Sequence, residues 1–294
     1  MDLTLALHGQ QAEVCLVGGR LSSYRVAGRE LLAGQEDPAR FAYRGALLVP
    51  WPNRVAAGRW SWQGEDLALP VNDPDTGSAL HGLVYAAPFA VESQTTSGIV
   101  LVHELAPSAG YPFRLLVRVS YALEPGGLVC SLSAVNLDDR PAPVGLGVHP
   151  YVAALELVDD LELTLPARTR VLTDAGWLEV GRMPATDFRA ARRIGPARLD
   201  TAFTDLVADA TGRLEVVFGL EDGQELVLWS GATCRWLVVY TGDTLLPAAR
   251  RRSVTVEPQT CPPNALATGQ IDVLDPGAAL RLDWGFTLRP GTAD

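Results

Sequence analysis

The feature that most constrains the fold is a succession of short apolar segments, each closed by a turn signal. The segments are rich in Val, Leu, Thr or aromatic residues, and several alternate apolar and polar side chains with the period of two that a half-buried strand requires. They are LTLAL (3–7), AEVCLVG (12–18), GIVLVHEL (98–105), FRLLVRVSYAL (113–123), GLVCSLSAV (127–135), LELTLP (161–166), RLEVVFGL (213–220), ELVLWS (225–230), RWLVVYT (235–241) and SVTVEP (253–258). The runs GG, DG, PGG, NLDD, TG and DP separate them, and such residues supply the special φ values of turns. The sequence therefore predicts a protein built mainly from β-strands.

Helical periodicity is scarce by comparison. The best candidate runs from Asp187 through the letters FRAARRI, about two turns, with Asp187 as the expected N-cap. Strand and helix patterns do not alternate, which argues against a doubly wound sheet or a TIM barrel. With 294 residues, 48% of them hydrophobic, the chain can bury one large core. We therefore expect an all-β fold, a large antiparallel β-sandwich, with residues 1–294 forming a single domain.

Charge and cysteine usage exclude several classes of protein. The net charge of −10 at pH 7, from 24 basic and 34 acidic side chains, repels nucleic acid and anionic membrane surfaces, so neither is expected as a partner.

The cysteines are scattered, at Cys15, Cys130, Cys234 and Cys261. Two disulfides would be possible, but this spacing favours reduced thiols and offers no ligand pair for structural zinc. The first residues, MDLTLALHGQ, lack the features of a secretory signal, and no run of about 20 apolar residues could span a bilayer, so a cytoplasmic location is expected.

Four polar clusters stand out among the expected loops and strand ends. Asn53 and Arg54 lie in PWPNRVAAGRW, between two tryptophans, in a region (35–80) that is expected to be rich in loops. His81 lies in ALHGL and His149 in GLGVHPYV, each beside a glycine or proline that marks a turn. Glu257 ends the apolar strand of SVTVEPQTCPPNA and precedes a proline, which favours an extended backbone at the glutamate. Long ordered loops on a rigid β scaffold are common places for binding sites.

Each of these residues also has an ordinary structural explanation. Arg54 alone is compatible with a surface arginine, a histidine in a turn is commonly a hydrogen-bonded structural residue, and a glutamate that leaves a sheet is commonly a surface carboxylate. Their combination indicates chemistry, because a carboxylate and an imidazole, with reference pKa values of about 4.3 and about 6.5, suit proton transfer near neutral pH. Tryptophan faces suit sugar C–H surfaces, and Arg or Asn binds hydroxyls. The residues therefore predict a polyol substrate and acid–base work, without fixing the reaction.

Five segments, in order along the chain, resemble the signatures of the aldose 1-epimerase, or galactose mutarotase, family. They are Asn53-Arg54-Val55, Ala79-Leu80-His81-Gly82, Gly147-Val148-His149-Pro150-Tyr151, Leu199-Asp200-Thr201-Ala202-Phe203 and Val256-Glu257-Pro258-Gln259-Thr260. They span residues 53–260, and the ordered set is far more specific than any one of them. Two departures, Val152 where the family usually has Phe and Gln259 where Met is common, bear on sugar preference more than on the type of reaction.

The resemblance implies a galactose mutarotase-like supersandwich and an enzyme that interconverts the α and β anomers of a free aldose of the glucose or galactose class. Glu257 is then the base and His149 the acid. The substrate-binding residues that it implies are Asn53, Arg54, His81 and Asp200. Neither a cofactor nor a metal ion is expected, because opening and closing the sugar ring moves protons but no electrons.

Three other functions stay open. A hexose-6-phosphate 1-epimerase would share the fold and the acid–base pair but would need a basic cluster for the phosphate; Arg44 and Arg59 are candidates, and the surrounding sequence contains no such cluster. A non-catalytic sugar-binding or sensor protein would not need both Glu257 and His149. A glycoside hydrolase would need two carboxylates flanking the bond, for which Asp200 and Glu257 are candidates. The expected partner is a small aldose, and the expected assembly is a monomer or homodimer.

Overall fold

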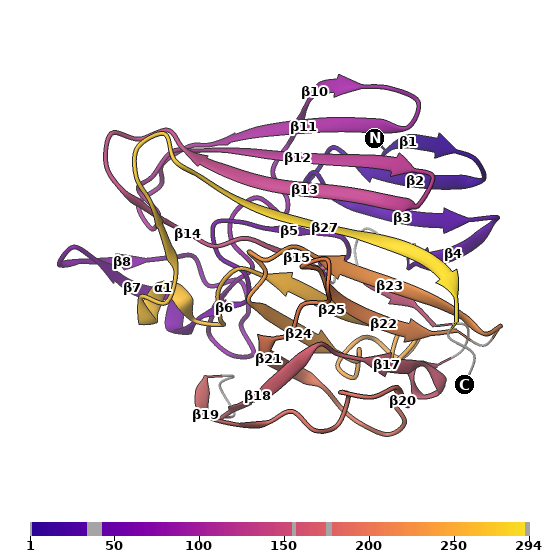
Figure 1. The fold of residues 1–294 in the computed structure, drawn as a ribbon. Helices are drawn as coiled ribbons and strands as arrows, with labels where there is room; N and C mark the ends of the chain where they lie inside the picture. The colour runs from indigo at the N-terminus through magenta and orange to yellow at the C-terminus, as the bar shows by residue number, and fades with distance from the viewer. Residues whose placement is uncertain (1, 34–42, 155–156, 175–177, 221, 292–294) are drawn as a thin grey trace.

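Two large antiparallel sheets, packed face to face, make up most of the molecule (Figure 1). The computed structural model describes residues 2–33, 43–154, 157–174, 178–220 and 222–291. The N-terminal strands at residues 2–15 of one sheet lie next to the strand at residues 115–124 of the other, and buried side chains of both sheets form one cluster. The expected all-β, antiparallel sandwich is therefore confirmed.

The first sheet contains 12 strands. In spatial order they are β1 (Asp2–Leu7), β2 (Gln10–Cys15), β3 (Leu21–Val26), β4 (Arg29–Leu32), β16 (Tyr151–Ala153), β25 (Ser253–Gln259), β24 (Trp236–Tyr240), β21 (Asp200–Leu206), β18 (Ala167–Thr173) and β19 (Glu179–Pro184), with β15 (Gly147–Val148) pairing with β25 and with β5 (Leu47–Leu48). Strands far apart in the sequence meet at the centre of this sheet, where β25 lies between β16 and β24.

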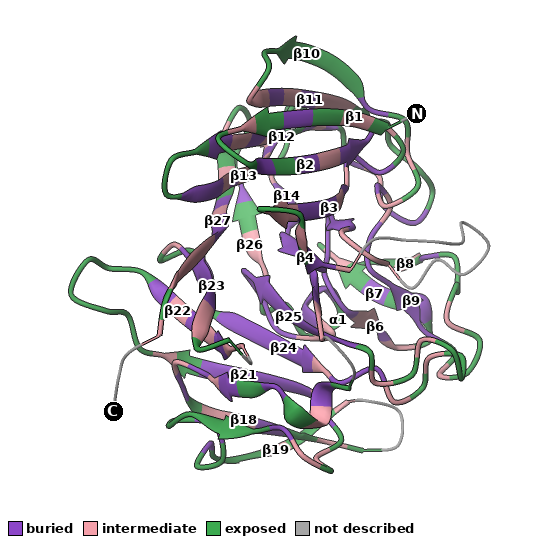
Figure 2. Ribbon diagram, turned by 90° about the vertical axis from the view of Figure 1, so that its right-hand side faces the viewer, coloured by how far each residue is buried: buried purple, intermediate pink, exposed green. Residues whose placement is uncertain are grey.

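The second sheet contains nine strands. Their order is β10 (Ala90–Gln94), β11 (Gly98–Leu105), β12 (Leu115–Glu124), β13 (Gly127–Asn136), β27 (Ala279–Pro290), β23 (Gln224–Ser230), β22 (Leu214–Gly219), β17 (Glu162–Thr164) and β20 (Arg192–Arg193). The edge strand β10 is exposed along its whole length (Figure 2). The long strand β27 joins β13 to β23 and so holds the two halves of this sheet together.

Three two-stranded sheets and three short helical turns complete the described structure. The small sheets pair β6 (Arg54–Val55) with β9 (Ala79–Leu80), β7 (Arg59–Trp62) with β8 (Glu65–Ala68), and β14 (Ala142–Val144) with β26 (Asp272–Leu274). The helical turns are η2 (Ala56–Gly58), η3 (Val158–Asp160) and α1 (Ala265–Thr268). Among the residues described, no helix is long and apolar enough to cross a membrane.

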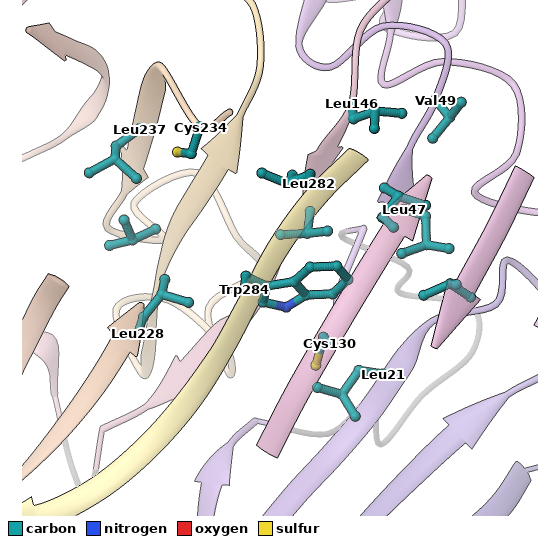
Figure 3. Close-up of a cluster of buried hydrophobic side chains, with 14 of the residues drawn as sticks. Leu21, Leu47, Val49, Cys130, Leu146, Leu228, Cys234, Leu237, Leu282 and Trp284 are labelled. Carbon is teal, nitrogen blue, oxygen red and sulfur yellow. The ribbon is translucent and has the colours of Figure 1, made fainter. Parts of the chain in front are cut away.

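One cluster of buried hydrophobic side chains fills the space between the two large sheets. It combines alternate residues of strands from both sheets, as the pleat requires when one face of each sheet is covered. Figure 3 shows part of it, in which Trp284 and Cys130 of the second sheet lie near Leu21 and Leu47 of the first. All four cysteines are buried and unpaired, which confirms the expected free thiols.

Each segment expected to be a strand contains one, but the predicted helix at 187–194 is wrong. Residues 187–190 form a turn and bend, and Arg192–Arg193 form β20. Phe188 and Ile194 are both buried, and residues six apart fall on different faces of a helix but on the same face of an extended chain. Backbone bonds from Leu165 to Phe188 and from Ile194 to Leu161 hold the segment against β17 instead.

The loop-rich region expected at 35–80 is partly confirmed. Residues 35–42 lie outside the described residues, and the described remainder carries the short strands β5 to β9 and the helical turn η2 within long connections. The tryptophans of this region do not form an open sugar platform. Trp51 and Trp60 are 2% and 4% exposed and pack against Tyr111 in the interior. Their large apolar area is more favourable in the core than in a hydrated pocket.

Candidate active site

Strand β25 presents one face to the core and the opposite face to the site. Val254 and Val256 point into the main hydrophobic cluster, so Thr255, Glu257 and Gln259 lie on the other face by the period-two rule. The whole strand is buried (Figure 2). A second hydrophobic cluster lies on the same face as the glutamate, because Val238 is paired with Glu257. It consists of Val171, Ala202, Trp236 and Val238.

His149 is brought to Glu257 by the short strand β15 and the turn after it. The backbone N–H of His149 donates to Ala46, and its carbonyl accepts from Gly45, so two bonds to a neighbouring segment fix the residue. Its Nε2 lies 3.3 Å from Oε1 of Glu257, and Nδ1 lies 3.5 Å from Oγ1 of Thr255. Both His149 and Glu257 are buried, at 5% and 2% exposure, so the imidazole and the carboxyl face one another out of bulk water.

His81 and Asn53 hold one another in a tight reciprocal arrangement where β6 meets β9. The N–H of His81 donates to the carbonyl of Asn53 over 3.0 Å, and the N–H of Asn53 donates to Nδ1 of His81 over 3.2 Å. Both have a left-handed backbone, with φ of 62° and 59°, a conformation that Asn and His adopt more readily than most residues. Gly82 follows because a Cβ there would lie 2.1 Å from the carbonyl oxygen of Val49. The rings of His81 and His149 are 5.1 Å apart.

Arg54 supplies the positive charge of the site and is held by Asp73. Its Nε donates to Oδ2 of Asp73 over 3.0 Å, and the same oxygen accepts from Thr76. The guanidinium lies close enough to lower the pKa values of Asp200 and Glu257. The surface-arginine explanation is therefore wrong, because the side chain is only 15% exposed and faces carboxyl groups within the site.

Asp200 begins β21, across β24 from Glu257, and completes the set. Burial raises its pKa to about 6, while the charge of Arg54 lowers it. The structure thus brings together all six residues singled out from the sequence: Asn53, Arg54, His81, His149, Asp200 and Glu257.

Tyrosines, which the sequence analysis did not single out, provide the aromatic surroundings. Tyr43 contacts His81 edge-on at 4.6 Å and Tyr85 at 5.1 Å. Tyr151 stacks on His149 with the ring centroids 5.1 Å apart, and the Arg44 guanidinium lies over the Tyr151 ring, 4.4 Å from its centroid. Tyr151 is part of the Gly-x-His-Pro-Tyr segment and could have been found from it. Tyr43 and Asp73 lie outside the five motif segments, so nothing in the sequence marked them as site residues.

The environment shifts the acid–base pair towards its uncharged forms. Burial raises the pKa of Glu257 well above its ordinary value, and the charge of Asp200 raises it further, against lowering by the Gln259 hydrogen bond and Arg54. Burial lowers the pKa of His149 to about 3, and the charge of Arg44 also lowers it. These directions favour a neutral carboxyl beside a neutral imidazole over the ion pair in the free site. Moving the carboxyl proton across the 3.3 Å contact gives an ionised base beside a protonated acid without any exchange with solvent.

His81, His149 and Glu257 offer three ligand atoms within 4.8 Å of one another, which is a possible metal cluster. The hydrogen bonding of His81 does not suit a metal ion. Its Nδ1 accepts from the backbone N–H of Asn53, and burial lowers its pKa well below the ordinary value, so the neutral ring carries its proton on Nε2. Neither ring nitrogen then has a free lone pair for a metal. The same tautomer leaves Nε2–H as a hydrogen-bond donor.

Comparison with known proteins identifies the family of the chain. The family model described as aldose 1-epimerase matches residues 1–287. The uncharacterized protein YihR of Escherichia coli (strain K12) is 30% identical over 279 residues, which cover 92% of this chain and 87% of that protein.

Solved structures share the fold at lower identity. The galactose 1-epimerase of Lactobacillus acidophilus NCFM superposes with a TM-score of 0.84 at 21% identity, covering 99% of this chain and 95% of that one. The GalM/aldose epimerase homologue from C. elegans gives 0.86 at 17% identity and covers 99% of both chains. These likenesses establish the galactose mutarotase-like architecture. The family match over residues 1–287 and the 30% identity to YihR show that the chain belongs to the aldose 1-epimerase family.

Proposed function

We propose that this protein is an aldose 1-epimerase that interconverts the α and β anomers of a free aldose of the glucose or galactose class. The observation that supports this best is the contact of 3.3 Å between Nε2 of His149 and Oε1 of Glu257, buried among groups that bind hydroxyls. A protein that only binds sugar has no need for a buried carboxyl and imidazole that share one proton.

The reaction follows from where that proton can go. Glu257 takes the proton from the C1 hydroxyl while His149 gives its proton to the ring oxygen, and the C1–O5 bond breaks to leave an open-chain aldehyde. Rotation about C1–C2 turns the other face of the carbonyl towards O5. Closure of the ring then returns the proton from Glu257 to the new C1 hydroxyl, and His149 recovers its proton from O5. Protons are conserved over the cycle and no electrons are exchanged, so no cofactor is required.

The other residues hold the sugar during this rotation. Arg54 and Asp200 present a guanidinium and a carboxyl of raised pKa to the hydroxyls, and Nε2–H of His81 can donate to the oxygen that gains charge as the ring opens. Asn53 keeps His81 in place and, through Oδ1, accepts the backbone N–H of Arg54 over 2.8 Å. A general acid and a general base contribute about 10²–10⁴-fold each, and positioning supplies the remainder.

Polarimetry tests the proposal directly. Fresh α-D-glucose and α-D-galactose are followed with and without the protein, and their 6-phosphates are measured next. Acceleration on the free sugars supports the aldose 1-epimerase. Acceleration on the 6-phosphates alone would instead identify a phosphosugar epimerase, and binding without acceleration would identify a sugar-binding protein.

Replacing Arg54 with alanine is expected to lower kcat/KM roughly ten- to over a hundred-fold, because a charged hydrogen bond in a desolvated site contributes about 1.5–3 kcal/mol. Polarimetric kinetics on the folded variant measure the loss. Arg59→Ala is the matched control, since Arg59 is exposed on the neighbouring strand β7 and should leave kcat/KM unchanged. Equal values for both variants would show that Arg54 does not contact the sugar.

Prolonged dialysis against EDTA is expected to leave activity unchanged, because the proton on Nε2 of His81 blocks the candidate metal cluster. The measurement is the polarimetric rate before and after dialysis, with readdition of zinc, magnesium or manganese. A loss that one of these ions restores would contradict both the tautomer and the metal-free reaction.

A further inference from the structure

Gln259 is attached to the proposed base. Its side chain is fully buried, and Nε2 donates to Oε2 of Glu257 over 2.9 Å. The other carboxyl oxygen of Glu257 faces Nε2 of His149 at 3.3 Å. Each carboxyl oxygen therefore has its own partner, and the carboxyl cannot rotate without losing both contacts.

The other end of the Gln259 amide lacks a partner. Its Oε1 is buried and accepts no hydrogen bond from the residues that the structure describes. Leaving a buried acceptor unsatisfied costs about 1–3 kcal/mol, and folded proteins contain few such groups. Exchanging the two ends of the amide would place its oxygen against a Glu257 oxygen, an arrangement that an ionised base repels. The orientation in which Nε2 donates to Glu257 is therefore the one that stabilises the ionised base, and in this orientation Oε1 stays unsatisfied.

The Gln259 side chain is packed closely between its neighbouring strands. Gly147, paired with Gln259 on β15, makes room for it, because a Cβ at Gly147 would lie 3.2 Å from Cγ of Gln259 and 2.8 Å from Cβ of Pro52. On its other side Gln259 is paired with Trp236 of β24. A confined acceptor beside the base is suited to receive a hydrogen bond from a bound molecule.

We propose that Gln259 both positions Glu257 and binds the C2 hydroxyl of the aldose through its unsatisfied Oε1. This inference rests on the proposed function, in which Glu257 takes the proton from the C1 hydroxyl. Within the ring, C1 has two neighbours, the ring oxygen and C2, and of these only C2 carries a hydroxyl that can donate. The amide that bonds to the base is therefore next to the C2 hydroxyl when the C1 hydroxyl is next to the base.

The test compares D-glucose with 2-deoxy-D-glucose in wild type and Gln259→Met. Methionine removes both polar ends of the side chain with little change in volume. In wild type the C2 hydroxyl should raise kcat/KM and sugar affinity. In the variant this preference should shrink roughly 3- to 10-fold, the scale of one hydrogen bond. The intrinsic reactivity of each sugar cancels in this ratio of ratios, and 6-deoxy-D-glucose should show no such change.

A second readout separates positioning from a purely structural role. Because the amide hydrogen bond lowers the pKa of Glu257, its removal should move the basic limb of kcat/KM to higher pH. Gln10→Met is the matched control, since Gln10 is also buried but bonds to Tyr24 and Glu124, which are not residues of the candidate site. This variant should change neither readout.

The outcomes distinguish this inference from the proposed function. An unchanged preference for the C2 hydroxyl in Gln259→Met, or an equal change in Gln10→Met, would overturn the inference while wild-type turnover still supports the epimerase. Absence of wild-type turnover would overturn the proposed function. The ratio of calorimetric affinities for the two sugars would then still decide whether Gln259 contacts the C2 hydroxyl, and a protein that binds neither sugar would overturn both.

Discussion

Replacing Glu257 with glutamine is expected to lower the rate of anomer exchange by about 10²-fold or more, the usual scale for removal of a general base. The amide has the size of the carboxyl and still offers an oxygen next to His149 and a sugar hydroxyl, but it cannot take a proton at neutral pH. Sugar affinity should change much less than rate, because the affected interaction strengthens mainly in the transition state. A sugar sensor, in contrast, would lose little of either.

The decisive measurement places polarimetric rates beside calorimetric affinities for the same preparation. Spontaneous mutarotation is subtracted, and it sets the largest loss that can be measured. Glu65→Gln, at an exposed position on β8, controls for the change in net charge. A folded Glu257→Gln protein with a near-wild-type rate would mean that another residue is the base.

Much of the fold could be predicted because strand patterns are local. The predicted segments coincide with strands wherever apolar and polar residues alternate clearly, as in Leu115–Glu124 and Gly127–Asn136. The longest strand, Ala279–Pro290, was missed, although it lies at the centre of the second sheet. Arg281 and Asp283 interrupt its first half, and cross-strand partners on both sides, which the sequence cannot identify, keep it extended.

The residues of the candidate site could be named from the sequence, but their electrostatic surroundings could not. The motifs named Glu257 and His149, whereas the position of the shared proton depends on burial and on Arg44 and Asp200, which topology brings close. The support of Arg54 by Asp73 also depends on how the loop after β8 folds back. Conversely, the tryptophans of the loop region suit a sugar surface by residue type, but Trp51 is in the core, because the sequence does not show which side of a loop faces inward.

Replacing His149 with asparagine is expected to cost about 10²–10⁴-fold in kcat/KM and to reverse its dependence on pH around the raised pKa of Glu257. The wild-type pair is active only while it holds one proton. Burial raises the pKa of Glu257 and lowers that of His149 to about 3, so in the free enzyme the single proton leaves from the carboxyl. Above that pKa the pair has no proton to give to the ring oxygen, and wild-type kcat/KM should fall.

In His149→Asn the requirement for a protein acid is gone, and only the base matters. Glu257 must lose its own proton to act, so the residual kcat/KM should rise with pH through the raised pKa of Glu257 and then level off. The two profiles therefore have opposite slopes over the same range, although both titrations involve Glu257, because the limbs of the wild-type profile belong to the coupled pair.

Enzyme-free rates at each pH are subtracted, and His8→Asn, at an exposed turn whose φ of 46° suits asparagine, should keep the wild-type profile. A falling alkaline limb in folded His149→Asn would show that the acid is a different group. His81 would then be the candidate acid, because the hydrogen bond from Asn53 keeps its proton on Nε2. In that case His81→Asn should remove the falling limb of the pH profile.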